Sequence, residues 1–321
     1  MTTSSGGSQG GPRSGPDLET IVAALESMGP EGLAGLVPPT PDPSLYLDDP
    51  VLASVVVRDV TVAGPHGEVL GRVYRHPTDR RDSAMVWVHG GAFMGGDLDM
   101  PEAHWVSLAI AAHGFGVLSV DYRKCLGGVH YPVPSDDVLA AWRWAIGHVD
   151  EFGVSADRLH LGGASAGGSL AAGVTKRLRD GAGGLPASVV LVYPTLHPDL
   201  PPMTEDVATA TEALRKAMPV ELVRWMSLKY VGSEDLLADP YAFPGLGDVG
   251  GQPAVYVLNS ENDVLRASGE AYAAALVAAD VSVTVEYEPD TKHGHLNQPL
   301  LPESCSRRTP TATLGTMPAS V

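Results

Sequence analysis

The segment Gly163-Ala164-Ser165-Ala166-Gly167 carries most of the information about how this chain folds. It follows the apolar run Leu159-His160-Leu161 and opens a helix-like stretch from Gly168 to Asp180. A serine between a strand and a helix, in a Gly-x-Ser-x-Gly setting, is typical of a nucleophile elbow. Glycine on either side lets the strand and the helix pass closely around a strained serine. The pattern makes Ser165 the candidate nucleophile.

A second motif supplies backbone hydrogen-bond donors, which a nucleophile needs beside it for acyl transfer. His89-Gly90-Gly91-Ala92-Phe93 follows the apolar stretch Ala84 to Val88. Glycine at positions 90 and 91 lets backbone N–H groups approach a substrate without a clashing Cβ. Acyl transfer needs an activated nucleophile and donors for the negative charge on the carbonyl oxygen. The two motifs together therefore indicate serine-type acyl transfer.

Composition excludes several other classes of protein. The chain has 321 residues and 44% hydrophobic residues, enough for a large buried core. Its 21 basic and 38 acidic residues give a net charge of −17, which disfavours nucleic acid or an anionic membrane as partner. Cys125 and Cys305 form neither a disulfide framework nor a metal-binding spacing. We expect no cofactor and no metal.

The N-terminal residues 1–16 are rich in Ser, Gly and Pro, and they lack the apolar core of a secretory signal. They are predicted to be a disordered tail. No stretch reaches the roughly 18 consecutive apolar residues of a membrane span. These features predict a cytoplasmic protein without a membrane span.

Strand-like and helix-like patterns alternate along most of the chain, which predicts an α/β fold with a mostly parallel central sheet and helices on both faces. Residues 17–54 are predicted to be a helical cap segment and connector. The core is expected in two parts, 55–194 and 233–300. Between them, residues 195–232 have helical spacing and interrupt the rhythm, as a small helical cap or lid would. Residues 301–321 are predicted to be an irregular tail.

A base and an acid must complete the site, because a serine hydroxyl is a poor nucleophile until a base takes its proton. When an elbow supplies the serine, the acid and then the histidine follow it along the chain. Of the 11 histidines only His197, His293 and His295 follow Ser165, and His197 comes too early to leave room for an acid. His293 and His295 both follow the strand predicted over Val281 to Tyr287. Glu261 and Asp263 follow the strand predicted over Ala254 to Leu258, and the chemistry of these residue types leaves both pairs open.

The chain resembles the hormone-sensitive-lipase-like family of α/β-hydrolase carboxylesterases over roughly residues 55–299. The matching pieces are His89 to Phe93, Asp121-Tyr122-Arg123, Tyr131 to Pro134, Gly163 to Gly168, Asp239-Pro240-Tyr241, Asp263 to Arg266 and His293-Gly294-His295. The resemblance implies Asp263 as the acid and His293 as the base. It implies an oxyanion hole from the N–H groups of Gly90, Gly91 and Ala166.

Three positions depart from the family pattern. Ala92 replaces a third glycine and Ala164 replaces an aspartate, and neither change touches the predicted triad. Pro302 to Val321 has little helical periodicity, although the family ends in an amphipathic helix that often takes part in dimer contacts. This departure leaves the oligomeric state open, with a homodimer as the candidate assembly.

The resemblance implies a serine hydrolase that cleaves small to medium acyl esters through an acyl-enzyme. Phe93, Met94, Trp225 and Met226 are candidate acyl-pocket residues, and their alternative role is packing a lid against the domain. The same triad would serve an amidase, a lactonase or a biosynthetic deacylase. The alternative from another class is a non-catalytic ligand-binding protein on the same fold.

Overall fold

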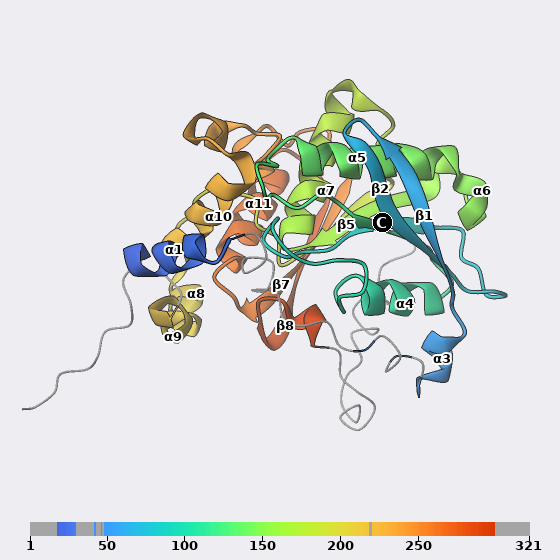
Figure 1. Ribbon diagram of the computed structural model, residues 1–321, viewed down its shortest axis with the longest axis horizontal. Helices are drawn as coiled ribbons and strands as arrows, with labels where there is room; N and C mark the ends of the chain where they lie inside the picture. The colour runs from blue at the N-terminus through green and yellow to red at the C-terminus, as the bar shows by residue number, and fades with distance from the viewer. Residues whose placement is uncertain (1–17, 30–41, 43–45, 47, 218–219, 299–321) are drawn as a thin grey trace, which may run out of the picture.

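An eight-stranded sheet forms the centre of the molecule (Figure 1). The computed structural model describes residues 18–29, 42, 46, 48–217 and 220–298. The strand order is β1-β2-β4-β3-β5-β6-β7-β8. β2 pairs antiparallel with β1 and β4, and every pairing from β4 to β8 is parallel. The strands are β1 Val56–Gly64, β2 Gly67–Arg75, β3 Ala84–Val88, β4 Gly116–Asp121, β5 Leu159–Ala164, β6 Ser188–Val192, β7 Ala254–Asn262 and β8 Val283–Lys292.

Helices cover the sheet and extend beyond one end of it. The α-helices are α1 Leu18–Ser27, α3 Pro50–Ala53, α4 His104–Ala112, α5 Val133–Gly147, α6 Val149–Phe152, α7 Ala166–Arg177, α8 Glu205–Ala210, α9 Glu212–Ala217, α10 Glu221–Val231 and α11 Arg266–Ala278. Shorter turns of helix are η2 Ala156–Arg158, η3 Leu178–Ala182, η4 Glu234–Ala238, η5 Pro244–Leu246 and η6 His295–Asn297.

The sheet has a hydrophobic core on each face. Strand β3 is fully buried, and its residues alternate between the two cores, as a pleated strand requires. Val86 and Val88 join the cluster that includes residues of α5, α7 and α11. Met85 and Trp87 join the cluster that includes residues of α4. In Figure 1, α4 accordingly lies on one side of the sheet, and α5 and α7 lie on the other. The predicted α/β-hydrolase architecture is confirmed.

The parallel strands end at the same edge of the sheet, and this edge positions the candidate site. The glycine motif that begins at His89 follows β3, and Ser165 follows β5. Asp263 directly follows β7 and His293 directly follows β8. In open α/β sheets, ligands bind outside these carboxyl ends. Four separate sequence segments thus meet at one place.

The last two strands are longer than the sequence pattern predicts. The predicted strand Ala254 to Leu258 continues to Asn262, because the polar residues after Leu258 still pair with β8. Asn259 and Ser260 are fully buried in this extension. A short apolar run marks only the part of a strand that lies in the hydrophobic core. The buried polar end of β7 therefore looked like a loop.

The segment 195–232, predicted as a cap, contains α8, α9 and α10. Helix α1 packs beside α10 (Figure 1), where Lys229 Nζ lies 3.0 Å from Glu26 Oε1. The predicted tails, residues 1–16 and 301–321, lie outside the described residues, as does most of the connector between α1 and α3. Within the described part of the chain, no helix is long and apolar enough to cross a membrane.

Candidate active site

Ser165 lies at a sharp turn between β5 and α7. Its backbone has φ 53° and ψ −120°, a region that costs a non-glycine residue about 1–3 kcal/mol. Such strain persists only where the surrounding structure enforces it. The Ser165 N–H donates to the Val192 carbonyl at 2.9 Å, which fixes the turn to β6. The side chain is thereby held at the carboxyl edge of the sheet.

The two glycines of the elbow are required by close backbone contacts. A Cβ on Gly163 would lie 2.5 Å from the carbonyl of Gly167. A Cβ on Gly167 would lie 2.1 Å from the carbonyl oxygen of Val88 in β3. Both distances are far inside van der Waals contact, and the obstructing atoms are backbone. The spacing of the motif thus follows from how tightly α7 packs on β3 and β5.

A chain of hydrogen bonds connects Ser165 to a buried carboxylate. Ser165 Oγ lies 2.9 Å from His293 Nε2, and His293 Nδ1 lies 2.7 Å from Asp263 Oδ2. Asp263 is fully buried, and its other oxygen accepts the Leu265 N–H at 2.9 Å. These distances let a proton move from the serine to an imidazole whose orientation the carboxylate fixes.

The electrostatic surroundings favour a proton on His293. Burial opposes the charged imidazolium, but the Asp263 carboxylate outweighs it and raises the pKa of His293 above its ordinary value. About a third of the His293 side chain (34%) is nevertheless exposed, so a substrate can reach it. The imidazole is thus a base whose protonated form the site stabilises.

The hydrogen bonds distinguish His293 from His295 and Asp263 from Glu261, between which the chemistry of the residue types could not choose. His295 Nδ1 lies 2.9 Å from Ser260 Oγ, and burial lowers the pKa of His295 to about 4. Glu261 accepts the Asp290 N–H at 2.7 Å, in the turn that precedes His293. His293 and Asp263 alone form the chain of hydrogen bonds to Ser165.

The glycine motif after β3 presents backbone amides beside the serine. The φ values of Gly91, Ala92 and Phe93 are all positive, at 109°, 53° and 63°. Successive amides in such a turn form a concave group of N–H donors. Among the described residues, the amides of Gly91, Ala92 and Ala166 donate to no backbone carbonyl outside regular structure. These three amides are candidate donors for an incoming oxygen.

Gly90 differs from the expectation drawn from the sequence. Its N–H donates to Glu102 Oε2 in a short hydrogen bond, so this amide already has a partner. A Cβ on Gly90 would meet that same oxygen at 2.5 Å. The glycine therefore allows the close approach of a carboxylate, and its amide is not the free oxyanion donor that the motif predicted.

Comparison with known proteins identifies the family. The model of a family described as having an alpha/beta hydrolase fold matches residues 85–297, which is more than half of the chain. The chain belongs to this family. Its members include the hormone-sensitive-lipase-like carboxylesterases, so the predicted resemblance is confirmed and the chain is a carboxylesterase-type hydrolase.

Individual relatives agree with this assignment. The carboxylic ester hydrolase LipN of Mycobacterium tuberculosis is 30% identical, over 88% of this chain and 77% of the relative. An ethyl acetate hydrolase of Pseudomonas putida is also 30% identical, over 74% of each protein. Among solved structures, an esterase of Pyrobaculum calidifontis is 27% identical, with a TM-score of 0.70 over 88% of this chain and 91% of that chain.

In this carboxylesterase, sequence reasoning missed the group of side chains behind the glycine motif. Glu102 is 1% exposed, and Tyr193 donates its hydroxyl to Glu102 Oε1 at 2.6 Å. Asn297 Nδ2 lies 3.3 Å from the same oxygen. No local pattern marks a lone glutamate before a helix, since its side-chain partners follow β3 and β6 or lie near the C-terminal end of the described chain.

The four predicted acyl-pocket residues lie mostly in packed clusters. Phe93 is 2% exposed and stacks on Tyr230 with ring centroids 4.0 Å apart, and Met94 and Trp225 are also buried. Met226 is half-buried and contacts the small cluster that contains Val264 and Leu265. Of the four predicted pocket residues, only Met226 is partly exposed, and it also contacts the residues that follow Asp263.

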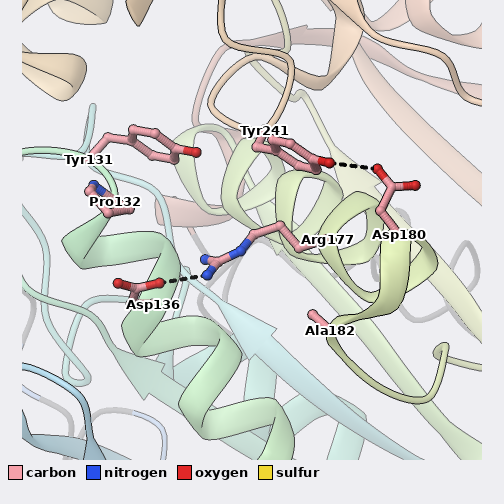
Figure 2. A pocket seen from close by; sticks show the side chains of 7 residues that line it. All are labelled: Tyr131, Pro132, Asp136, Arg177, Asp180, Ala182 and Tyr241. Atoms are coloured by element: carbon pink, nitrogen blue, oxygen red, sulfur yellow. Dashed lines mark hydrogen bonds and ion pairs between the residues drawn. The ribbon is translucent and has the colours of Figure 1, made fainter.

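A separate cavity of about 480 Å³ has Asp136, Arg177 and Tyr241 among its lining residues (Figure 2). Arg177, on this cavity, is twelve residues after Ser165, about 18 Å along a helix axis. Arg177 Nη2 pairs with Asp136 Oδ1 at 2.7 Å, and the Tyr241 hydroxyl donates to Asp180 at 3.0 Å. These charged groups are paired with one another, and the cavity is not the acyl site.

Proposed function

We propose that this carboxylesterase hydrolyses small to medium acyl esters through an acyl-enzyme on Ser165. The observation that carries the proposal is the chain of hydrogen bonds from Ser165 through His293 to buried Asp263. A serine at a strained elbow, a histidine within 2.9 Å and a buried acid behind it are the parts that acyl transfer requires.

In the first half of the reaction, His293 Nε2 takes the proton from Ser165 Oγ as this oxygen attacks the ester carbonyl carbon. The resulting imidazolium is stabilised by Asp263 through Nδ1. It then gives its proton to the alkoxide leaving group as the C–O bond breaks. The alcohol departs and an acyl-serine ester remains.

In the second half, water replaces the alcohol. His293 takes a proton from the water as the hydroxide attacks the acyl carbon, and it returns the proton to Ser165 Oγ when the acyl–serine bond breaks. The products are a carboxylic acid and the free enzyme. No cofactor enters this balance.

We further propose that the amides of Gly91, Ala92 and Ala166 form the oxyanion hole. The free N–H groups of the turn after β3 and the first N–H of α7 support this assignment. Removing one such donor in a serine hydrolase typically costs on the order of 10² to 10³ in rate. Gly90 is replaced in this set by Ala92, because the Gly90 amide is bonded to Glu102.

The limit on acyl length is proposed from the surroundings of Met226. This side chain contacts the cluster of Val264 and Leu265, which directly follow Asp263, and it comes from cap helix α10. An apolar wall so close to the acid suits a short acyl chain. One relative is named as a hydrolase of ethyl acetate, which also supports small esters.

The test is hydrolysis of p-nitrophenyl esters from acetate to longer acyl chains by the wild type and by Ser165→Ala. We expect turnover of the shorter esters and a loss on the order of 10⁶-fold in kcat for the variant. A folded wild type that binds these esters without turnover would favour a ligand-binding protein instead. Turnover of the corresponding anilides or lactones at a higher kcat/KM would favour the amidase or lactonase alternative.

A further inference from the structure

A buried carboxylate connects the two loops that the proposed reaction needs. Glu102 lies just before α4 and is 1% exposed. Its Oε2 accepts the N–H of Gly90, the residue before the proposed oxyanion donors. Its Oε1 accepts the Tyr193 hydroxyl at 2.6 Å and the Asn297 side-chain N–H at 3.3 Å. One side chain thus holds the glycine loop after β3 against the segment after β8.

The connection to the histidine loop has a second bond. Asn297 Oδ1 accepts the backbone N–H of Glu102 at 3.2 Å, so the two residues pair through both backbone and side chain. Asn297 is four residues after His293, in the short turn η6. The backbone of Glu102 is fixed independently, because the Trp87 indole donates to its carbonyl at 2.7 Å. Movement of Glu102 would therefore shift both loops together.

Among the described residues, the partners of the Glu102 carboxylate are neutral hydrogen-bond donors. Within the described ranges, no Lys, Arg or His side chain forms an ion pair with it. A buried carboxylate without a cation is costly, even when donors satisfy its oxygens. A glutamine would have the same volume but not the same hydrogen bonds, because its NH₂ group would face either the Gly90 N–H or the donors from Tyr193 and Asn297. The position thus needs a group whose two oxygens both accept hydrogen bonds, which a carboxylate supplies and an amide does not.

Tyr193 connects this carboxylate to His293, because its hydroxyl donates to Glu102 and its ring contacts the imidazole. The titratable side chains nearest to His293 are Asp263 after β7, Tyr193 after β6 and His295 in η6, and Glu102 before α4 follows as the partner of the Tyr193 hydroxyl. The Tyr193 ring lies edge-on to both imidazoles, with centroids 5.0 Å apart in each case. Burial and then Glu102 raise the pKa of Tyr193 far above its ordinary value, so it stays a neutral donor. The carboxylate of Glu102 adds to that of Asp263 in raising the pKa of His293.

We propose that Glu102 is a positioning residue for ester hydrolysis: its buried carboxylate holds the oxyanion loop against the histidine loop and stabilises the imidazolium form of His293 during turnover. This inference rests on the proposed triad. It assigns Glu102 two roles: its two acceptor oxygens hold the loops together, and its charge favours the protonated form of the base.

The test compares Glu102→Gln and Glu102→Asp in the full chain, with kcat and KM for p-nitrophenyl acetate measured across pH and active sites counted by burst amplitude. Glu102→Gln removes the charge, so we expect the acid limb of kcat/KM to move to lower pH. We also expect kcat to fall on the order of 10²-fold, because misplacing reacting groups by about 1 Å costs this much. Glu102→Asp keeps the charge, so its acid limb should stay near that of the wild type while kcat falls.

The matched control is Glu151→Gln, which removes a glutamate from a surface ion pair with Arg58. It should match the wild type in kcat and in the acid limb. A residue that only supports the fold would lower the number of active sites and leave the limb where it is. An unmoved limb, together with a kcat per active site that is unchanged or raised in Glu102→Gln, would overturn the inference.

If Glu102→Gln does not fold, Asn297→Ala decides the question, because it keeps the carboxylate and cuts its connection to the histidine loop. We expect a loss of roughly ten-fold in kcat with an unmoved limb, and a wild-type kcat would overturn the inference. Ser165→Ala, measured alongside, separates the two proposals. Turnover in Ser165→Ala would refute the triad and this inference with it. An inactive Ser165→Ala with a wild-type-like Glu102→Gln would refute the inference alone.

Discussion

Asp263 is the residue whose replacement changes the chemistry with the least change in shape. Its Oδ2 accepts from His293 Nδ1, and this bond selects the tautomer whose Nε2 faces Ser165. In Asp263→Asn the amide N–H₂ would favour the opposite tautomer. We expect kcat to fall on the order of 10⁴-fold with little change in KM. Steady-state kinetics on p-nitrophenyl acetate checks this, and a loss of less than ten-fold would argue against Asp263 as the acid.

The same carboxylate predicts how activity depends on pH. A protonated His293 cannot take the proton of Ser165, so kcat/KM falls as the pH drops through the pKa of His293. Asp263 raises this pKa despite burial, so the acid limb should lie above the ordinary histidine value of roughly 6.5. In Asp263→Asn the residual activity should have its limb at lower pH. A wild-type limb below the ordinary value would contradict the electrostatic account.

The elbow between β5 and α7 shows how an element places a residue. In Gly167→Ala the new Cβ would lie 2.1 Å from the Val88 carbonyl oxygen and 2.4 Å from that of His89. Backbone atoms cannot move aside as a flexible side chain can. Overpacking usually costs about 1–3 kcal/mol, and we expect a loss of unfolding free energy at or above the upper end of that range.

The matched control for this change is Gly147→Ala at the end of α5, where a Cβ would have no neighbour within 4 Å. Its unfolding free energy should stay within about 1 kcal/mol of the wild type. Urea unfolding followed by circular dichroism measures both variants. Equal stability of the two variants would mean that close packing does not explain the glycine of the elbow.

Elements differ in how well the sequence predicted them. The elbow could be predicted because all of its determinants lie within five residues. The polar end of β7 could not, since Asn259 and Ser260 look like loop residues and are recognised as strand only through their pairing with Tyr287 and Glu288 in β8. The local pattern of apolar and polar residues predicts which side chains are buried, whereas the pairing of a strand depends on a segment far away in the sequence.

At the scale of the whole molecule, the sheet separates two cores. Leu170 of α7 belongs to the core shared with α5, and Leu108 of α4 belongs to the core on the other face. Both are almost fully buried, so each change to alanine should lower the unfolding free energy by about 2–5 kcal/mol. Because the residues share no partners across the sheet, the double variant should lose the sum of the two values within about 0.5 kcal/mol.

Chemical unfolding of the two single variants and the double variant checks this expectation. A single transition in each variant would show that the sheet couples the two cores. Two separate transitions would show that the two cores do not unfold as one cooperative unit. A loss in the double variant that is far from the sum would show that the two sites are not energetically independent.

Long-range contacts also explain what the sequence could not reveal about the site. Chemistry narrowed the base to His293 or His295 and the acid to Asp263 or Glu261, and family resemblance was needed to choose between them. Neither residue chemistry nor family resemblance predicted Glu102, because its bond to Asn297 joins residues 195 positions apart. The hydrogen bond from the Gly90 N–H to Glu102 is the reason that our proposal replaces Gly90 by Ala92 in the oxyanion hole. The glycine motif gives no sign of this carboxylate.

The central claim is that Ser165 carries the acyl group, and rapid quenching tests it most directly. Wild-type protein is mixed with p-nitrophenyl acetate, quenched in acid within the burst and digested, and the acetyl group is located by peptide mass spectrometry. We predict an acetyl group on Ser165 in the wild type and none at that position in Ser165→Ala. A burst of p-nitrophenol with the acetyl group on another residue, or with no acylated peptide at all, would contradict the account.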